Sequence, residues 1–116
     1  MQNEITPYDG SQKLQVCAKV WFELDGRRVF GEGRAKLLRL VQETKSINLA
    51  AKKKGISFRR AWGIIKEMEE ILGVTLVEKR RGGVGGGMAI VTPKALELIE
   101  SYEKINTEFK RSMQKK

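Results

Sequence analysis

Hydrophobic residues recur along this chain with two different periods, and each change of period marks an expected boundary between elements. From Leu14 to Leu24 apolar residues occupy every second position, which predicts a strand with one buried face. Asp25-Gly26 follows and matches a two-residue hairpin turn, because a type I′ turn requires a positive φ at both positions. We therefore expect a return strand from Arg27 to Phe30, which completes an N-terminal β-hairpin.

The middle of the chain has the three- and four-residue spacing of amphipathic helices. We expect one helix from Arg34 to Lys45, and then two more that are joined by a tight turn. Ser46 and Ser57 precede these two later helices as N-caps, and Gly55 supplies the positive φ that ends the first of them. The last helix of the three has one continuous apolar side, formed by Ala61, Ile64, Ile65, Met68, Ile71 and Leu72. A short helix, a glycine turn and a longer amphipathic helix are the plan of a helix-turn-helix.

A glycine-rich stretch separates two further strand-like runs. We expect strands from Val74 to Arg80 and from Met88 to Val91, with the glycines at the tip between them. Beside a helix-turn-helix, such a hairpin is a wing. The competing interpretation of the glycines as a phosphate-binding P-loop fails, because no Gly-Lys-Ser/Thr follows and the next element is a strand.

The last predicted helix begins at Thr92-Pro93, with Thr92 as the N-cap and Pro93 at the first helical position. Its outer turns carry more apolar residues than a small domain can cover, which favours pairing with a second copy over a frayed C-terminus. Trp21, on the more polar face of the first strand, is a further candidate for this contact, with local packing as the alternative. The predicted dimer interface comprises Leu98, Tyr102, Ile105, Phe109, Met113 and Trp21.

These elements divide the chain into three expected segments. Residues 1–13 form a flexible arm, residues 14–113 form one domain that includes a dimerisation helix at about 93–113, and residues 114–116 form a tail. The 116 residues suit a single domain with one modest core. The predicted fold class is α+β, mainly α: a winged helix-turn-helix with an N-terminal β-hairpin, a β-hairpin wing and a long C-terminal dimerisation helix.

The charge of the chain narrows the class of partner. Its net charge is +9, so we expect a polyanionic partner, although bulk charge alone also fits a membrane-surface or an RNA-binding protein. Histidine is absent and Cys17 is the single cysteine, which argues against zinc sites, an internal disulfide and Ser-His or Cys-His catalysis. We expect no enzyme, no metal and no cofactor. No apolar stretch approaches the ~20 residues that span a bilayer, and the N-terminus lacks a signal-peptide core, so the expected location is cytoplasmic, without a membrane partner.

Basic residues cluster at the turn of the predicted helix-turn-helix. Lys52 to Lys54, Arg59 and Arg60 stand there with no acidic residue among them, although a solvated, charged face is the ordinary alternative for any amphipathic helix. Gly63 lies on the exposed side in mid-helix, where glycine costs ~1 kcal/mol relative to alanine but lets another surface approach the backbone. We therefore expect contact with duplex DNA through Ser46, Lys52, Lys53, Lys54, Ser57, Phe58, Arg59, Arg60, Gly63, Lys66, Lys79, Arg80, Arg81, Gly82 and Gly83.

The segment from Gly31 to Thr92 resembles the N-terminal winged-helix domain of ModE-type molybdate-responsive transcriptional regulators, a LysR-like winged helix. The most specific parts are Gly33-Arg34, the run SFRRAW from Ser57 to Trp62, Leu76-Val77 and the tip GGVGGG. The preceding hairpin, VWFELDGRRVFGEG, is similar to the first two strands of that family. The resemblance therefore covers roughly Leu14 to Tyr102, which is most of the chain.

This resemblance implies a dimeric, sequence-specific repressor or activator that reads an inverted repeat with the helix from Ser57 and with the wing. It also implies that the terminal helices of the domain form the dimer. Full-length members carry C-terminal molybdate-binding domains of the small β-barrel type, and this sequence ends where they would begin. We therefore expect no molybdate binding from this chain alone. Lys45 stands where a glycine is common in the family.

Two function classes remain open on the sequence. The leading one is a sequence-specific transcriptional regulator that contacts double-stranded DNA through the basic residues named above. The alternative is a protein-interaction or dimerisation module with only non-specific nucleic-acid binding, which the acidic Glu67, Glu69 and Glu70 leave open. RNA binding ranks below both, because no exposed aromatic platform for stacking bases is evident.

Overall fold

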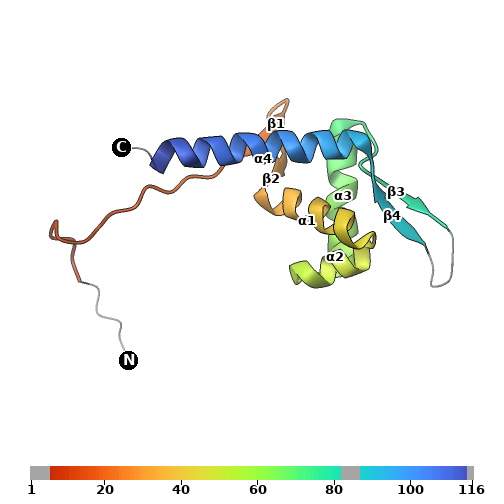
Figure 1. Cartoon of the computed structure of the whole chain (residues 1–116), viewed down its shortest axis with the longest axis horizontal. Coiled ribbons are helices and arrows are strands. Elements are labelled where there is room, and N and C mark those ends of the chain that lie inside the picture. Colours follow the sequence, from red (N-terminus) through yellow and green to blue (C-terminus); the bar gives the residue numbers. More distant parts are fainter. Residues whose placement is uncertain (1–5, 82–86, 115–116) are drawn as a thin grey trace.

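The computed structural model describes residues 6–81 and 87–114 of the chain. Four helices and four strands occur within these residues, and Figure 1 shows how they are arranged. In chain order they are β1 (Trp21–Leu24), β2 (Arg27–Gly31), α1 (Glu32–Thr44), α2 (Ile47–Lys54), α3 (Phe58–Leu72), β3 (Val77–Arg80), β4 (Met88–Val91) and α4 (Pro93–Gln114). The predicted α+β fold with mainly helical content is confirmed.

Helices α2 and α3 form the helix-turn-helix, and their ends are set by the residues that the sequence identified. The Oγ of Ser46 accepts a hydrogen bond from the backbone N–H of Leu49, at 3.0 Å, and so caps α2. Gly55 ends α2 with a φ of 80°, a left-handed conformation that costs glycine little. The Oγ of Ser57 then caps α3 by accepting from the N–H of Arg60, also at 3.0 Å.

Strands β3 and β4 pair in antiparallel fashion and form the wing, with Lys79 opposite Ala89 in the register. Strand β3 begins at Val77, three residues later than predicted from the β-branched run that starts at Val74. The Oγ1 of Thr92 accepts a hydrogen bond from the N–H of Ala95, at 3.2 Å, and caps α4 as the sequence predicted. Together with the helix-turn-helix, these elements make the molecule a winged helix-turn-helix.

The N-terminal hairpin has its predicted turn but a shorter first strand. Asp25 and Gly26 have φ values of 50° and 79°, which confirms the turn. The predicted strand from Leu14 was wrong for residues 14–20, because β1 begins only at Trp21. The return strand β2 has five residues and its pairing ends at the Trp21–Gly31 rung, so it offers no partner to the earlier part. Leu14 and Val16 are accordingly 73% and 79% exposed.

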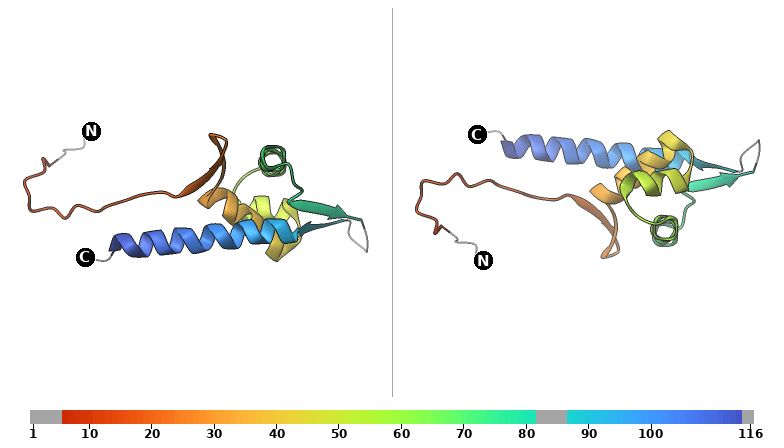
Figure 2. Two further views of the ribbon diagram at one scale, coloured as in Figure 1. Left: turned by 90° about the horizontal axis from the view of Figure 1, so that it is seen from above. Right: turned by 90° about the horizontal axis from the view of Figure 1, so that it is seen from below.

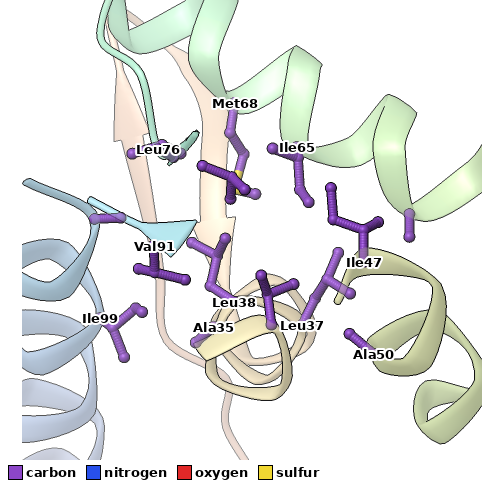
Figure 3. Packing of buried hydrophobic residues seen from close by; sticks show 14 of the residues in the cluster. Ala35, Leu37, Leu38, Ile47, Ala50, Ile65, Met68, Leu76, Val91 and Ile99 are labelled. Carbon is purple, nitrogen blue, oxygen red and sulfur yellow. The ribbon is translucent and has the colours of Figure 1, made fainter. Parts of the chain in front are cut away.

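The core lies where the helices meet the wing, and it is assembled from every helix. Figure 3 shows Leu38 of α1, Ile47 of α2, Ile65 of α3, Val91 of β4 and Ile99 of α4 pointing toward one another. These side chains are buried. Each full burial of an aliphatic side chain stabilises the fold by roughly 1.5–3 kcal/mol. Because residues of α3 and of the wing belong to the same cluster, both elements pack on one hydrophobic core.

Tyr102 also belongs to this core, so its assignment to the dimer interface was wrong. Its side chain is 2% exposed. The ring packs edge-on against Phe22 and Phe30, with centroid separations of 5.4 and 5.5 Å. The apolar positions from Leu98 to Met113 spread over more than one face of α4, and Tyr102 lies on the inner edge of that spread. Periodicity alone does not separate the inner edge from the outer one.

Two parts of the chain extend away from this core in opposite directions. Figures 1 and 2 show the wing at one end of the molecule, and at the other end the second half of α4 with the segment before β1, from residue 6 on, beside it. The radius of gyration is 18.7 Å, whereas a compact domain of this length has about 13 Å. In the described residues, no helix combines the length and the apolar character that crossing a membrane requires.

Candidate nucleic-acid interface

The start of α3 and the end of α2 bring the predicted basic residues together. Lys52 and Lys53 are exposed on the last turn of α2, and Lys54 beside them is half-buried. Arg59 and Arg60 are exposed on the first turn of α3, immediately after the glycine turn. Within residues 6–81 and 87–114, no carboxylate lies within ion-pair distance of either arginine. Their guanidinium groups are therefore available to an external partner.

Other arginines of the domain are engaged internally. The Nη2 of Arg34 lies 2.9 Å from the Oε2 of Glu67, and this hydrogen bond holds the pKa of that carboxyl below its ordinary value. Arg39 donates to both carboxylate oxygens of Glu103, at 3.0 and 2.8 Å, and likewise lowers the pKa of Glu103. The two arginines at the start of α3 differ from these, because nothing inside the described structure uses them.

Gly63 lies one turn after Arg59 and is exposed. A Cβ placed on Gly63 would meet no atom within 4 Å, so internal packing does not require a glycine at this position. Glycine in a helix interior loses roughly 0.5–1 kcal/mol relative to alanine. The open backbone at Gly63 therefore has no explanation in the fold of the single chain, and it faces outward from a helix that starts with two free arginines.

A row of partly exposed side chains runs along the side of α3 that lies next to strand β3. Phe58, Trp62 and Lys66 follow one another at intervals of four residues, so they lie on one side of the helix. The Nζ of Lys79 on β3 lies 4.4 Å from the ring centroid of Trp62 and 5.5 Å from that of Phe58. The Nζ of Lys66 lies 4.7 Å from the Trp62 ring and 3.5 Å from the Oε1 of Glu69.

This row includes a residue that the sequence reasoning missed. Trp62 was not among the predicted site residues, although its four-residue spacing from Phe58 and from Lys66 is the signal that identifies it. Phe58, which the sequence did assign to the site, is 42% exposed, and the ammonium of Lys79 lies over its ring. Lys66 and Lys79 both direct their ammonium groups at these rings.

The base of the wing carries two more exposed basic residues. Arg80 lies 3.7 Å from Glu78 through its Nη2, and both side chains remain largely in solvent. Arg81 is exposed at the end of β3. Gly82 and Gly83, which the sequence assigned to DNA contact, lie outside the described residues. Gly87, where the wing returns, has no room for a side chain, because a Cβ would lie 2.8 Å from the carbonyl oxygen of Arg80.

The remaining predicted dimer residues lie on or near the surface of the projecting elements. Ile105 and Phe109 are 44% and 43% exposed on α4, and Met113 is half-buried one turn further on. Leu98 is half-buried and packs against the core. Trp21 is exposed on β1, where the guanidinium of Arg28 lies 4.7 Å from its ring centroid. An apolar strip therefore continues along α4 beyond the core, on the half that projects from the body.

No group of three or more histidine, cysteine, aspartate or glutamate side chains that could hold a metal occurs in the part of the chain that the structure describes. The surface described above consists of basic side chains at the end of α2, at the start of α3 and at the base of the wing. Cations on the exposed start of a helix and on an adjacent wing are suited to the phosphates and the base edges of a duplex.

Curated proteins similar to this chain are named as regulators or as molybdenum-related proteins. The molybdenum-pterin-binding protein MopB of Rhodobacter capsulatus is 37% identical over 87 residues, which cover 74% of this chain and 32% of MopB. The DNA-binding transcriptional dual regulator ModE of Escherichia coli K12 is 40% identical over 70 residues, which cover 60% of this chain and 27% of ModE. The resemblance to ModE-type regulators is confirmed, and this chain spans about a third or less of the length of these relatives.

Solved structures with a similar fold include two DNA-binding domains in complex with DNA. The CbnR domain in complex with DNA matches with a TM-score of 0.54 at 24% identity, over 70% of this chain and 88% of that chain. The BenM domain bound to benA site 1 DNA matches with a TM-score of 0.52 at 24% identity, over 68% and 83% of the two chains. Both confirm the winged-helix fold. Residues 34–95, more than half of the sequence, match the bacterial regulatory helix-turn-helix proteins of the lysR family, and the chain belongs to that family.

Proposed function

We propose that this chain is the DNA-binding part of a transcriptional regulator and that it recognises a specific sequence in double-stranded DNA. The observation that carries the proposal is the state of Arg59 and Arg60, which are exposed and free of described ion pairs at the start of α3. The lysR-family match and the names of the ModE relatives support the same conclusion. As part of this proposal, the protein binds DNA without acting as an enzyme, and it is located in the cytoplasm, where the DNA lies.

The residues divide between sequence reading and positioning. Helix α3 enters the major groove, where Arg59 and Arg60 pair with the N7 and O6 acceptors of guanine and Gly63 permits close approach of the backbone. Lys52 to Lys54 neutralise phosphates of one strand, together with the N-terminal N–H groups of α2 and α3. Arg80 and Arg81 contact the backbone or the adjacent minor groove from the base of the wing.

The regulator acts as a homodimer on an inverted repeat. Ile105, Phe109 and Met113 recur at intervals of four residues on the projecting half of α4, where the described chain leaves the first two more than two-fifths exposed. Burying such a strip against its own copy removes apolar surface from water and creates a two-fold axis. A two-fold dimer presents two copies of α3 to two half-sites, so the preferred site is palindromic.

The test begins with selection of duplexes from a randomised pool by the wild-type protein at physiological salt. A recovered palindrome, measured by fluorescence anisotropy against a scrambled duplex, is the expected result. Arg59→Ala should then cost about 1–3 kcal/mol on the selected duplex and relax one position of the site. Lys53→Ala should weaken binding to all duplexes alike and reduce the salt slope by about one.

Arg27→Ala is the matched control, because it removes the same charge from an exposed arginine of the N-terminal hairpin. It should leave specificity unchanged. If the selection enriches no sequence and binding is uniformly weak and steeply dependent on salt, the chain is an interaction or dimerisation module and the regulator proposal fails.

A further inference from the structure

Helix α3 contacts strand β3 and the residue before it at two places, one through Glu69 and one through Lys79. The carboxylate Oε2 of Glu69 accepts hydrogen bonds from the backbone N–H groups of Leu76 and Val77, at 2.8 and 3.2 Å. Two residues further along the strand, the ammonium of Lys79 lies over the rings of Trp62 and Phe58. Strand β3 is therefore held against α3 at its start by a charged hydrogen bond and near its middle by a cation on two aromatic rings.

The other strand of the wing is tied to a different helix at the same rung. Ala89 stands opposite Lys79 in the wing. Its backbone N–H donates a 2.9 Å hydrogen bond to the carbonyl oxygen of Lys45, the residue that ends α1. The rung formed by Lys79 and Ala89 is thus attached on one side to α3 and on the other to α1. Figure 2 shows strands β3 and β4 projecting from the body of the molecule.

We propose that Trp62 and Lys79 are positioning residues that set the spacing between the recognition helix α3 and the wing. The inference rests on the proposed DNA-binding function and deepens it. A helix in the major groove and a wing on the neighbouring backbone engage one duplex together only at one relative placement. A protein that holds this placement before binding gains affinity, because a smaller share of its molecules is in a non-competent arrangement. Lys79 accordingly acts on the rings of α3 and not on a phosphate.

The geometry separates this role from direct contact. Lys79 lies on the opposite side of its strand from Glu78 and Arg80, because side chains alternate along β3. Its ammonium is 4.4 Å from the centroid of Trp62, and the ammonium of Lys66 is 4.7 Å from the same centroid. Trp62 is only half-exposed and is shared by these two cations, whereas Gly63 beside it is open.

The variants that test the proposal remove or restore the ring–cation contact. On a duplex that the wild-type protein has selected from a randomised pool, Trp62→Leu and Lys79→Met should each bind about five- to thirtyfold more weakly. Trp62→Phe and Lys79→Arg, which keep a ring and a cation, should recover most of the affinity. The double variant Trp62→Leu/Lys79→Met should be weaker than Trp62→Leu by less than Lys79→Met alone costs, since both changes remove the contact between Trp62 and Lys79 and only the second also removes the contact between Lys79 and Phe58. Lys36→Met, at an exposed position of α1, is the control for loss of one charge.

Chemical footprints decide which part of the contact is lost. With Trp62→Leu, protection of guanine N7 from dimethyl sulfate should persist, because α3 still enters the major groove. Protection of the flanking sugars from hydroxyl radicals should disappear, because the wing no longer sits on them. Circular dichroism and thermal unfolding serve as folding controls, and the exposed Lys79 provides a second variant if Trp62→Leu is unfolded.

Three results would overturn the inference. Wild-type affinity for both Trp62→Leu and Lys79→Met would show that the contact does not position the wing. Loss of the guanine N7 protection in Trp62→Leu would make Trp62 a base contact. A salt slope that falls by about one in Lys79→Met but not in Trp62→Leu, with weakening on all duplexes alike, would make Lys79 a phosphate contact. Failure of the wild-type protein to select any duplex would instead count against the proposed function itself.

Discussion

The hydroxyl of Tyr102 on α4 donates a 2.8 Å hydrogen bond to the carbonyl oxygen of Val20, the residue that precedes β1. This bond connects the N-terminal hairpin to the long helix across most of the sequence. Tyr102→Phe keeps the ring against Phe22 and Phe30 but leaves the carbonyl without its donor. We expect the free energy of unfolding to fall by about 1 kcal/mol, measured by urea denaturation. Tyr102→Ala should cost about 3–5 kcal/mol, because the ring fills the core. Equal losses in the two variants would contradict this division between ring and hydroxyl.

Gly63→Ala should separate stability from DNA binding. A methyl group at this position meets no atom within 4 Å, so the helix should gain roughly 0.5–1 kcal/mol in thermal or chemical unfolding. Binding to the selected duplex should weaken in the same variant, because the methyl group enters the space between backbone and DNA. Unchanged affinity in a stabilised Gly63→Ala protein would place that backbone away from the DNA.

Lys45 adopts a left-handed conformation, with φ 56° and ψ 30°, at the end of α1. This conformation disfavours a side chain with a Cβ, while glycine adopts it with little strain. Lys45→Gly should therefore raise the free energy of unfolding by about 0.5–1 kcal/mol, net of the greater freedom of glycine in the unfolded chain. Lys45→Ala keeps the strain and removes the same amine, so it should not stabilise. A stabilised alanine variant would assign the effect to charge instead of backbone conformation.

Phe109→Glu tests the apolar strip of α4. The side chain is 43% exposed in the single chain, so a carboxylate there should leave the thermal midpoint of the domain nearly unchanged. In sedimentation experiments the wild-type protein should behave as a dimer and the variant as a monomer, because a charge in a dimer seam is costly to desolvate. Thr107→Glu places the same charge two residues away, about 200° around the helix, and should stay dimeric. A monomeric wild-type protein would exclude this interface.

The ion pair between Arg39 and Glu103 gives stability that depends on pH. Hydrogen bonds from Arg39 lower the pKa of Glu103 below its ordinary value of 4.5, so the folded state favours the ionised carboxylate. The contribution of this ion pair to the free energy of unfolding is complete above about pH 4.5, the ordinary pKa that Glu103 has in the unfolded chain. It is lost as the pH falls through the lowered pKa of the folded state. Because both side chains are partly exposed, we expect at most about 1 kcal/mol. At pH 7, Glu103→Gln should have a lower free energy of unfolding than the wild-type protein, measured by urea denaturation. This difference should shrink as the pH is lowered below 4.5. A constant difference at all pH values would contradict this account.

Local chemistry was readable from the chain itself. Ser46, Ser57 and Thr92 cap helices because a hydroxyl one residue before a helix can accept an orphan N–H, whatever the rest of the fold does. Gly55 and the pair Asp25-Gly26 take the positive φ values that their turns need. These contacts join residues within a few positions of one another, so residue type and spacing suffice to predict them.

Contacts between distant segments depended on the tertiary arrangement. The alternation of Leu14 to Val20 predicted a strand, but a strand forms only where a partner edge exists, and β2 ends opposite Trp21. Tyr102 and Phe109 stand on one apolar stretch of α4, yet only the first meets the N-terminal hairpin. Trp62 and Lys79 meet because β3 folds back along α3. The sequence alone determined the helices, turns and charges of this protein; which side chains became core, surface or link between helix and wing was decided by packing, since burial is a property of neighbours brought together in space.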